Sequence, residues 1–180
     1  MSSKTWLLLG LSSLLVIGCA PPVAEPVAAS EDSVDWDSLL PNPQRPEEGL
    51  LTGGQPSLEQ LEAIRDAGFR TVINLRAEGE KGAKAEAVEA LGMRYVALPI
   101  RGAESLTEDS AEAFAAVLAA AERPAIVHCG SGNRVGALFA LKAFYVDGAE
   151  VEEAYEVGRR AGLTRLSGSV RQILDEASAD

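Results

Sequence analysis

The chain has 180 residues, 47% of them hydrophobic, and a formal net charge of −11 at pH 7. A chain of this length and composition can bury one hydrophobic core, so we expect about one domain. The acidic balance argues against nucleic acid as a partner, because the nucleic-acid backbone selects basic surfaces.

The first 18 residues predict a signal peptide. A short basic start precedes an apolar segment, Trp6 to Ile17, that is too short for a comfortable transmembrane span. The segment closes at Gly18-Cys19 and resembles a bacterial lipobox, which implies cleavage before Cys19 and lipid attachment there. Because Ala20 follows, the resemblance implies a lipid anchor in the bacterial cell envelope, on the periplasmic face of the outer membrane. A plain secretory signal or an uncleaved anchor is the alternative.

Residues 19–48 predict a semi-extended tether, because they combine several prolines with alanine, serine and acidic residues and have no apolar periodicity. Trp36, Leu39 and Leu40 are exceptions. We expect them to pack onto the edge of the following domain, with an exposed protein-binding segment as the alternative.

Residues 49–180 predict a single α/β domain. Apolar runs indicate four strands, near 50–52, 71–75, 95–98 and 125–128. Helices are expected between and after these strands. Two of the helices are expected to begin at the N-caps Ser57 and Thr107. Four helices are expected to end at a glycine, namely Gly68, Gly92, Gly148 and Gly162. The alternation favours a central, mainly parallel four-stranded sheet flanked by helices, with the strand carboxyl ends at one edge.

The chemistry concentrates in residues 125–138, AIVHCGSGNRVGAL, where an apolar strand ends at a thiol and a short loop leads into a helix. Glycines at 130 and 132 allow successive backbone N–H groups to converge, and the helix start adds more donors. Arg134 supplies a planar, two-pronged donor for phosphate or sulfate oxygens. We expect this positive field to favour a nucleophilic thiolate at Cys129. A small buried cysteine before an ordinary turn is the alternative.

The order His-Cys, Gly/Ser loop, Arg, helix resembles the signature of cysteine-dependent tyrosine and dual-specificity phosphatases. With GGQPS at 53–57, GFRTVINLR at 68–76 and GAL at 136–138, the chain is similar to the bacterial beta-lactamase hydrolase-like, phosphatase-like domain family from about Leu50 to Leu166. The resemblance implies a cysteine phosphatase-like fold with a phosphate-binding loop. It also implies hydrolysis of phosphomonoesters, on small molecules or on protein phosphotyrosine, phosphoserine or phosphothreonine, through a Cys129 thiophosphate intermediate.

The predicted site has catalytic, substrate-binding and supporting members. Catalysis is assigned to Cys129, Arg134 and Glu104. Glu104 is the candidate general acid, although base rates for loop carboxylates favour a solvated side chain without a catalytic role. His128 and Asn74 are predicted to support the loop. Predicted substrate contacts are Gly130, Ser131, Gly132, Asn133, Val135, Gly136, Arg76 and Arg101. Ser131 and Asn133 could instead stabilise the loop, and Arg76 could pair with Glu78 or Glu80.

Two departures from the phosphatase pattern keep other functions open. Residues 130–133 separate Cys129 from Arg134, one residue fewer than in most tyrosine phosphatases and closer to rhodaneses. Val135 stands where a hydroxyl residue usually follows the arginine. A sulfurtransferase that carries a Cys129 persulfide and an inactive anion-binding module are therefore the alternatives. One histidine and one free cysteine are too few for a zinc site, so we predict neither metal nor cofactor.

Overall fold

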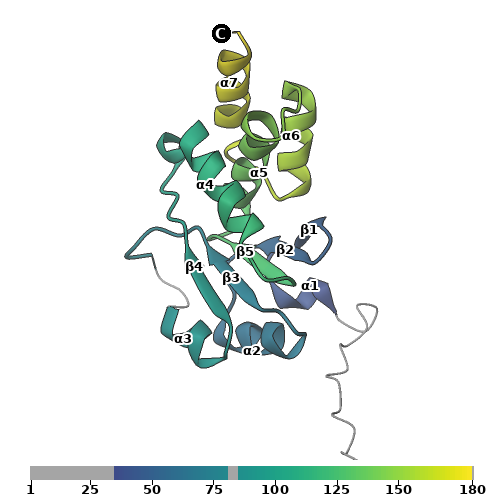
Figure 1. Cartoon of the computed structure of the whole chain (residues 1–180), viewed down its shortest axis with the longest axis vertical. Helices are drawn as coiled ribbons and strands as arrows, with labels where there is room; N and C mark the ends of the chain where they lie inside the picture. The colour runs from purple at the N-terminus through teal and green to yellow at the C-terminus, as the bar shows by residue number, and fades with distance from the viewer. Residues whose placement is uncertain (1–34, 81–84, 180) are drawn as a thin grey trace, which may run out of the picture.

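The computed structural model describes residues 35–80 and 85–179 (Figure 1). The predicted signal peptide at 1–18, the lipidation site Cys19 and the tether up to residue 34 lie outside these residues. Within the part of the chain that is described, no helix is long and apolar enough to cross a bilayer. No group of His, Cys, Asp and Glu side chains among the same residues is arranged to hold a metal ion.

The centre of the fold is a five-stranded sheet in the order β1-β2-β5-β3-β4. β2, β5, β3 and β4 are parallel, and β1 pairs antiparallel with β2. The strands are β1 Gln44–Glu47, β2 Leu50–Gly53, β3 Thr71–Asn74, β4 Arg94–Ala97 and β5 Ala125–His128. The predicted α/β fold and mainly parallel sheet are confirmed, but the predicted number of four strands is wrong.

The additional strand, β1, lies within the segment for which the sequence predicts a tether. It pairs Gln44 with Thr52 and Glu47 with Leu50. All of its residues are exposed or half-buried, and it contains Pro46. Proline and charged residues are tolerated in an edge strand because its outer side makes no ladder hydrogen bonds. The apolar patterns that identify the other strands are therefore absent from β1.

Helices cover both faces of the sheet (Figure 1). One face carries α4 Glu108–Ala119, α5 Asn133–Tyr145, α6 Val151–Arg160 and α7 Ser167–Ser178, with α5 in contact with the other three. The opposite face carries α1 Trp36–Leu39, α2 Leu58–Asp66 and α3 Ala85–Ala90. A short 3-10 helix, η2 Ala103–Ser105, lies between β4 and α4.

Alternating side chains along each strand divide the core into two clusters. Ile73 and Val127 pack with α4–α7, whereas Val72 and Ile126 pack with α1–α3. All four side chains are fully buried. Strands covered on both faces explain why the sequence shows continuous apolar runs there instead of alternation.

The predicted helix ends are confirmed. Ser57 and Thr107 each form a reciprocal capping box with the residue three positions later. The backbone φ is positive at the glycines predicted to end helices, which are Gly68, Gly92, Gly148 and Gly162. α5 begins at Asn133, directly after Gly132, so Arg134 lies in its first turn.

The carboxyl ends of the parallel strands form a row at one edge of the sheet. His128 at the end of β5 pairs with Gly53 of β2 and with Asn74 of β3, and Asn74 pairs with Ala97 of β4. The loop that begins at Cys129 therefore emerges between the loops that follow β2 and β3. This is the convergence that the predicted topology requires.

The described start of the chain packs against the domain. Trp36 contacts Phe69 edge to face, with ring centroids 5.3 Å apart. Leu39 and Leu40 are buried in the core cluster that includes Val72 and Ile126. The expected packing of these residues is confirmed. Their contact with the core explains how a proline-rich segment can lead into an ordered edge strand.

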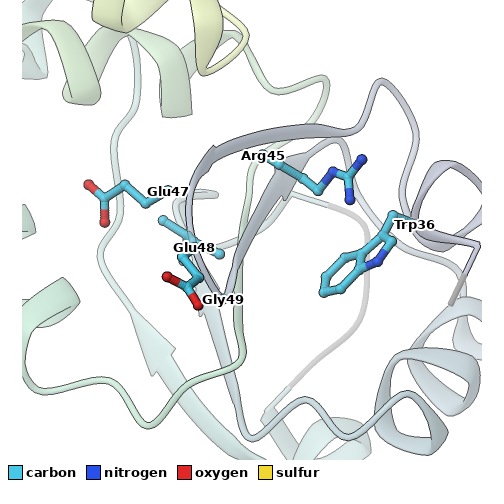
Figure 2. A pocket seen from close by; sticks show the side chains of 6 residues that line it. Trp36, Arg45, Glu47, Glu48 and Gly49 are labelled. Carbon is cyan, nitrogen blue, oxygen red and sulfur yellow. The ribbon is translucent and has the colours of Figure 1, made fainter. Parts of the chain in front are cut away.

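A cavity of about 250 Å³ opens at the amino-terminal end of β2, remote from Cys129. Figure 2 shows the Arg45 side chain extending toward the Trp36 indole, with its Cζ 5.6 Å from the ring centroid. The lining residues are Trp36, Arg45, Glu47, Glu48, Gly49 and Leu50. None of the predicted site residues lines this cavity, so the cavity is separate from the predicted active site.

Candidate active site

Cys129 follows β5 directly and begins the loop that leads to α5. Its side chain is 1% exposed, and its Sγ accepts a hydrogen bond from the Gly132 N–H at 3.2 Å. The Cys129 N–H donates to the Gly53 carbonyl at 3.2 Å, which holds the start of the loop against β2. An N–H donor stabilises negative charge on sulfur, so the surroundings of Cys129 suit the predicted nucleophile.

The backbone of this loop has N–H groups available to an anion. Those of residues 130, 131 and 133–135 donate no hydrogen bond to another described residue. Residues 133–135 form the first turn of α5, where N–H groups have no intrahelical acceptor. Gly132, the N-cap of α5, has a φ of 91°, which glycine adopts without steric cost.

Arg134 is held by contacts on one side of its guanidinium. Nη1 and Nη2 donate to the two carboxylate oxygens of Glu80 at 2.6 and 2.9 Å, and Nη1 also donates to the Ile100 carbonyl at 2.8 Å. The pKa of Arg134 is raised, first because of the hydrogen bonds to Glu80 and also because of the neighbouring Cys129. Arg134 therefore keeps its positive charge at all ordinary pH values.

The remaining edge of Arg134 suits a phosphate group. Glu80 and Ile100 take both Nη1 protons and one Nη2 proton, which leaves Nε and the other Nη2 proton on the edge away from Glu80, and Arg134 also interacts with the Cys129 thiol. These two N–H groups lie side by side on the planar guanidinium, where two oxygens of one anion can bind. A Cβ on Gly130 would lie 3.5 Å from Nη2, so this edge lies beside the loop. Glu80 thus positions Arg134 without occupying its anion-binding edge.

Glu80 forms ion pairs with two arginines, Arg76 and Arg134. Besides Arg134, its carboxylate accepts from Arg76 Nε at 3.1 Å and from the Ala77 N–H at 2.9 Å. These donors lower the pKa of Glu80 to about 2, with the hydrogen bonds from Arg134 as the largest cause. Glu80 is consequently ionised at neutral pH and cannot act as a general acid.

Arg76 contacts both Glu80 and Gln55. Its Nε donates to Glu80, and its Nη1 donates to Gln55 Oε1 at 2.9 Å. The expected pairing of Arg76 with Glu80 is confirmed. Its role in binding substrate remains a prediction, since both contacts connect it to protein groups.

Asn74 at the end of β3 and His128 at the end of β5 contact the loops that follow their strands. Asn74 donates to the Tyr95 hydroxyl at 2.8 Å and accepts from the Arg76 N–H at 2.9 Å, so it orders the loop after β3. His128 is 1% exposed, and its Nδ1 lies 3.4 Å from the Cys129 carbonyl. Burial is the main cause that lowers the pKa of His128 to about 4; Arg76 and Arg134 also lower it.

The buried, neutral His128 predicts a specific loss of stability in acid. Because the pKa is about 4 when folded and 6.5 when unfolded, the unfolded chain takes up the proton first as pH falls. Between pH 6.5 and 4, wild type should lose about 3 kcal/mol more of its free energy of unfolding than His128→Gln. Urea denaturation across this range measures the difference. Parallel pH profiles of the two proteins would contradict the assignment.

Asn133 stabilises the loop through its side chain. Its Oδ1 accepts from the Thr164 N–H at 2.9 Å, the Thr164 hydroxyl at 3.1 Å and the Leu166 N–H at 3.1 Å. Ser131 Oγ accepts from Arg165 Nη2 at 3.3 Å. These contacts favour the loop-stabilising alternative for both side chains and leave the N–H groups of residues 131 and 133 as their possible contacts with an anion.

Val135 and Gly136 are both buried in the first turns of α5. The Gly136 N–H donates to the Gly132 carbonyl at 3.0 Å, so it is not among the N–H groups available to an anion, and a contact of Gly136 with substrate remains a prediction. A Cβ at Gly136 would overlap the backbone of Leu163. The Val135 side chain is wholly buried in the core, so only its backbone N–H can face an anion. Packing against the following helices accounts for both residues.

This close contact makes Gly136→Ala strongly destabilising. The added methyl must displace the backbone at Leu163, at an expected cost of about 1–3 kcal/mol or more. Gly168→Ala in α7 is the matched control, because no atom lies within 4 Å of its added Cβ; it should be neutral or up to about 1 kcal/mol stabilising. Thermal or urea denaturation compares the two variants, and equal stabilities would refute the packing argument.

Glu104 and Arg101 lie on the loop between β4 and α4. The loop borders the site through the Ile100 carbonyl, which accepts from Arg134. Glu104 is exposed, and its Oε2 lies 2.6 Å from where a Cβ on Gly102 would stand. Neither side chain makes a hydrogen bond or ion pair with another described residue. The loop that carries both residues therefore borders the site, and the roles of their side chains remain predictions.

Two charged contacts of the phosphate-binding loop are not predicted from the sequence. The sequence predicts Glu80 only as a partner of Arg76, whereas its strongest contact is with Arg134. The contact of Arg165 with Ser131 has no counterpart in the predicted site. Glu80 follows a strand that ends at the same edge as β5, which is a usable signal, whereas the distance in sequence between residues 131 and 165 hides the second contact.

A family profile described as "DSP-PTPase phosphatase fused to NAD+ Kinase" matches residues 23–172. A beta-lactamase hydrolase-like protein of Xylella fastidiosa is 31% identical over 122 residues, which are 64% of this chain and 28% of that protein. The chain thus spans less than a third of the length of the curated relatives it matches.

Solved structures share the fold at lower identity. A candidate phosphatase from Neisseria meningitidis aligns with a TM-score of 0.62 and 23% identity, over 74% of this chain and 96% of that one. Pseudomonas aeruginosa TpbA, solved in complex with pTyr, aligns with a TM-score of 0.57 and 20% identity, over 77% and 91% of the two chains. These likenesses establish the cysteine phosphatase-like fold.

Proposed function

Since the chain belongs to the family described as "DSP-PTPase phosphatase fused to NAD+ Kinase", we propose that it hydrolyses phosphomonoesters with Cys129 as its nucleophile. The observation that carries the proposal is the position of the buried thiol. Its Sγ accepts from Gly132 within a loop whose other N–H groups and Arg134 have donors available for one anion. The proposed substrate of the protein is a phosphorylated small molecule or protein, and the pTyr bound to TpbA supports this class.

The proposed reaction has two displacements. The Cys129 thiolate attacks phosphorus, an S–P bond forms, and the P–O bond to the leaving group breaks. Water then attacks the phosphorus, the S–P bond breaks, and phosphate leaves while the thiolate is restored. The loop N–H groups and the Nε/Nη2 edge of Arg134 stabilise the charge on the phosphoryl oxygens in both steps.

We assign the proton for the leaving oxygen to Glu104. Glu80 is excluded because its low pKa keeps it ionised. Glu104 is a carboxyl on the loop whose Ile100 carbonyl contacts Arg134, which makes it a candidate donor next to the site. Val135 has no hydroxyl to assist the departure of the thiolate, so we expect slow turnover.

The experiment compares two reactions of reduced protein. A phosphatase releases inorganic phosphate from an aryl phosphate and has little activity toward thiosulfate. A sulfurtransferase, favoured by the short spacing between Cys129 and Arg134, does the reverse and gains the mass of one sulfur on Cys129. Protein that binds oxyanions but performs neither reaction would be an anion-binding module, and the proposal would fail.

We also propose that the mature protein is anchored in the bacterial cell envelope through lipid on Cys19, on the periplasmic face of the outer membrane. The support is the short apolar segment that closes at Gly18-Cys19. The expected result is membrane partition of the wild type and a lipid-modified Cys19 by intact mass. Cys19→Ser should lose both, and an unmodified chain that starts at Met1 would rule the anchor out.

A further inference from the structure

The loop between α6 and α7, residues 161–166, is hydrogen-bonded to Asn133 at the end of the phosphate-binding loop. Asn133 Oδ1 accepts from the N–H groups of Thr164 and Leu166, the two neighbours of Arg165. It also accepts from the Thr164 hydroxyl. The backbone on both sides of Arg165 is therefore tied to one side chain in the first turn of α5.

Close backbone contacts fix the same loop further. A Cβ on Gly162 would lie 3.3 Å from the Gly132 carbonyl, and the Leu163 backbone fills the space beside Gly136. These contacts connect the α6–α7 loop to the N-terminus of α5 without intervening side chains. Arg165 is consequently held at a defined position beside the site, although its own side chain is exposed.

The Arg165 guanidinium reaches the phosphate-binding loop. Its Nη2 donates to Ser131 Oγ at 3.3 Å, two residues along the chain from Cys129. Arg76 and Arg134 share the carboxylate of Glu80, whereas Arg165 forms no ion pair with a described residue. In a chain of net charge −11, an uncompensated cation next to an anion site is available to a second anion.

We propose that Arg165 is a specificity-determining residue that binds a second acidic group on the substrate, close to the phosphate that Cys129 attacks. This inference rests on the proposed phosphatase function. The second group is a carboxylate or a phosphate, both of which accept two parallel hydrogen bonds from a guanidinium. Because Arg165 is exposed, we expect it to strengthen binding by about fivefold at low salt.

The test measures binding of phosphotyrosine peptides to Cys129→Ser protein, which separates recognition from turnover. One pair of peptides differs only in flanking glutamates or glutamines, and a second pair in a neighbouring phosphoserine or serine. The acidic member of at least one pair should bind about fivefold more tightly, and Arg165→Gln in the same background should remove the preference. The pair that responds identifies the second group as carboxylate or phosphate.

Arg70→Gln is the matched control. It removes the same charge from an exposed residue that precedes β3, at the opposite edge of the sheet, and should leave the preference intact. The inference is overturned if Cys129→Ser protein with Arg165 intact shows no preference, if adding Arg165→Gln retains the preference, or if no peptide binds. Aryl phosphate hydrolysis by protein with Cys129 decides the proposed function independently, so either proposal can fail alone.

Discussion

The Cys129→Ser variant should release phosphate from an aryl phosphate about 10,000-fold more slowly than wild type, or slower still. A serine hydroxyl at this position has no general base to activate it, because the neighbouring His128 is buried and has its Nδ1 directed at a backbone carbonyl. Loss of a nucleophile commonly removes most of the rate enhancement while leaving the binding contribution. Single-turnover phosphate release by reduced protein measures the effect.

The same variant should still bind inorganic phosphate or vanadate. The available N–H groups of the loop belong to the backbone, and Glu80 and the Ile100 carbonyl hold Arg134 in place without the thiol. Calorimetry on the folded variant is the control for an indirect effect on the loop. Residual activity within tenfold of wild type would show that Cys129 is not the nucleophile.

Arg134→Ala should weaken binding of phosphate or vanadate by about 1.5–3 kcal/mol, roughly 10- to 150-fold, because the two-pronged donor to the anion is lost. Arg134→Lys should recover only part of this affinity, since an ammonium cannot present two parallel donors and hold Glu80 as well. Calorimetric titration of wild type and both variants gives the comparison.

Arg123→Ala is the control for a general effect of lost positive charge. Arg123 pairs with Glu47 on β1, beyond the amino-terminal end of β5 and far from the phosphate-binding loop. Its removal should leave anion affinity within about twofold of wild type. If Arg134→Ala binds oxyanions as tightly as wild type, the loop is not the anion site.

The elements that the sequence predicts well depend on local patterns. The four strands other than β1 contain apolar runs, and Ser57 and Thr107 form their capping boxes within one turn. The edge strand β1 has no apolar run, because most of its side chains are exposed to solvent and do not pack in the core. Its place in the sheet follows from the pairing with β2, which no apolar pattern records.

The site divides in the same way. Cys129 and Arg134 are only five positions apart in sequence, so the pattern of this one short segment predicts an anion site. The contacts of Glu80 with Arg134 and of Arg165 with Ser131 join residues 54 and 34 positions apart. Such contacts depend on how the loops lie at the end of the sheet. For Gly136, the pattern predicts a substrate contact where the fold requires space for Leu163.

The composition of β1 also bears on self-association. A sheet with such apolar inner strands would aggregate readily if its outer strand could add a strand from another copy. At this border, Pro46 lacks an N–H, and Arg45 and Glu47 are exposed charges. Each discourages an intermolecular ladder, so the least hydrophobic strand of the protein protects its most hydrophobic strands from fibril-like stacking.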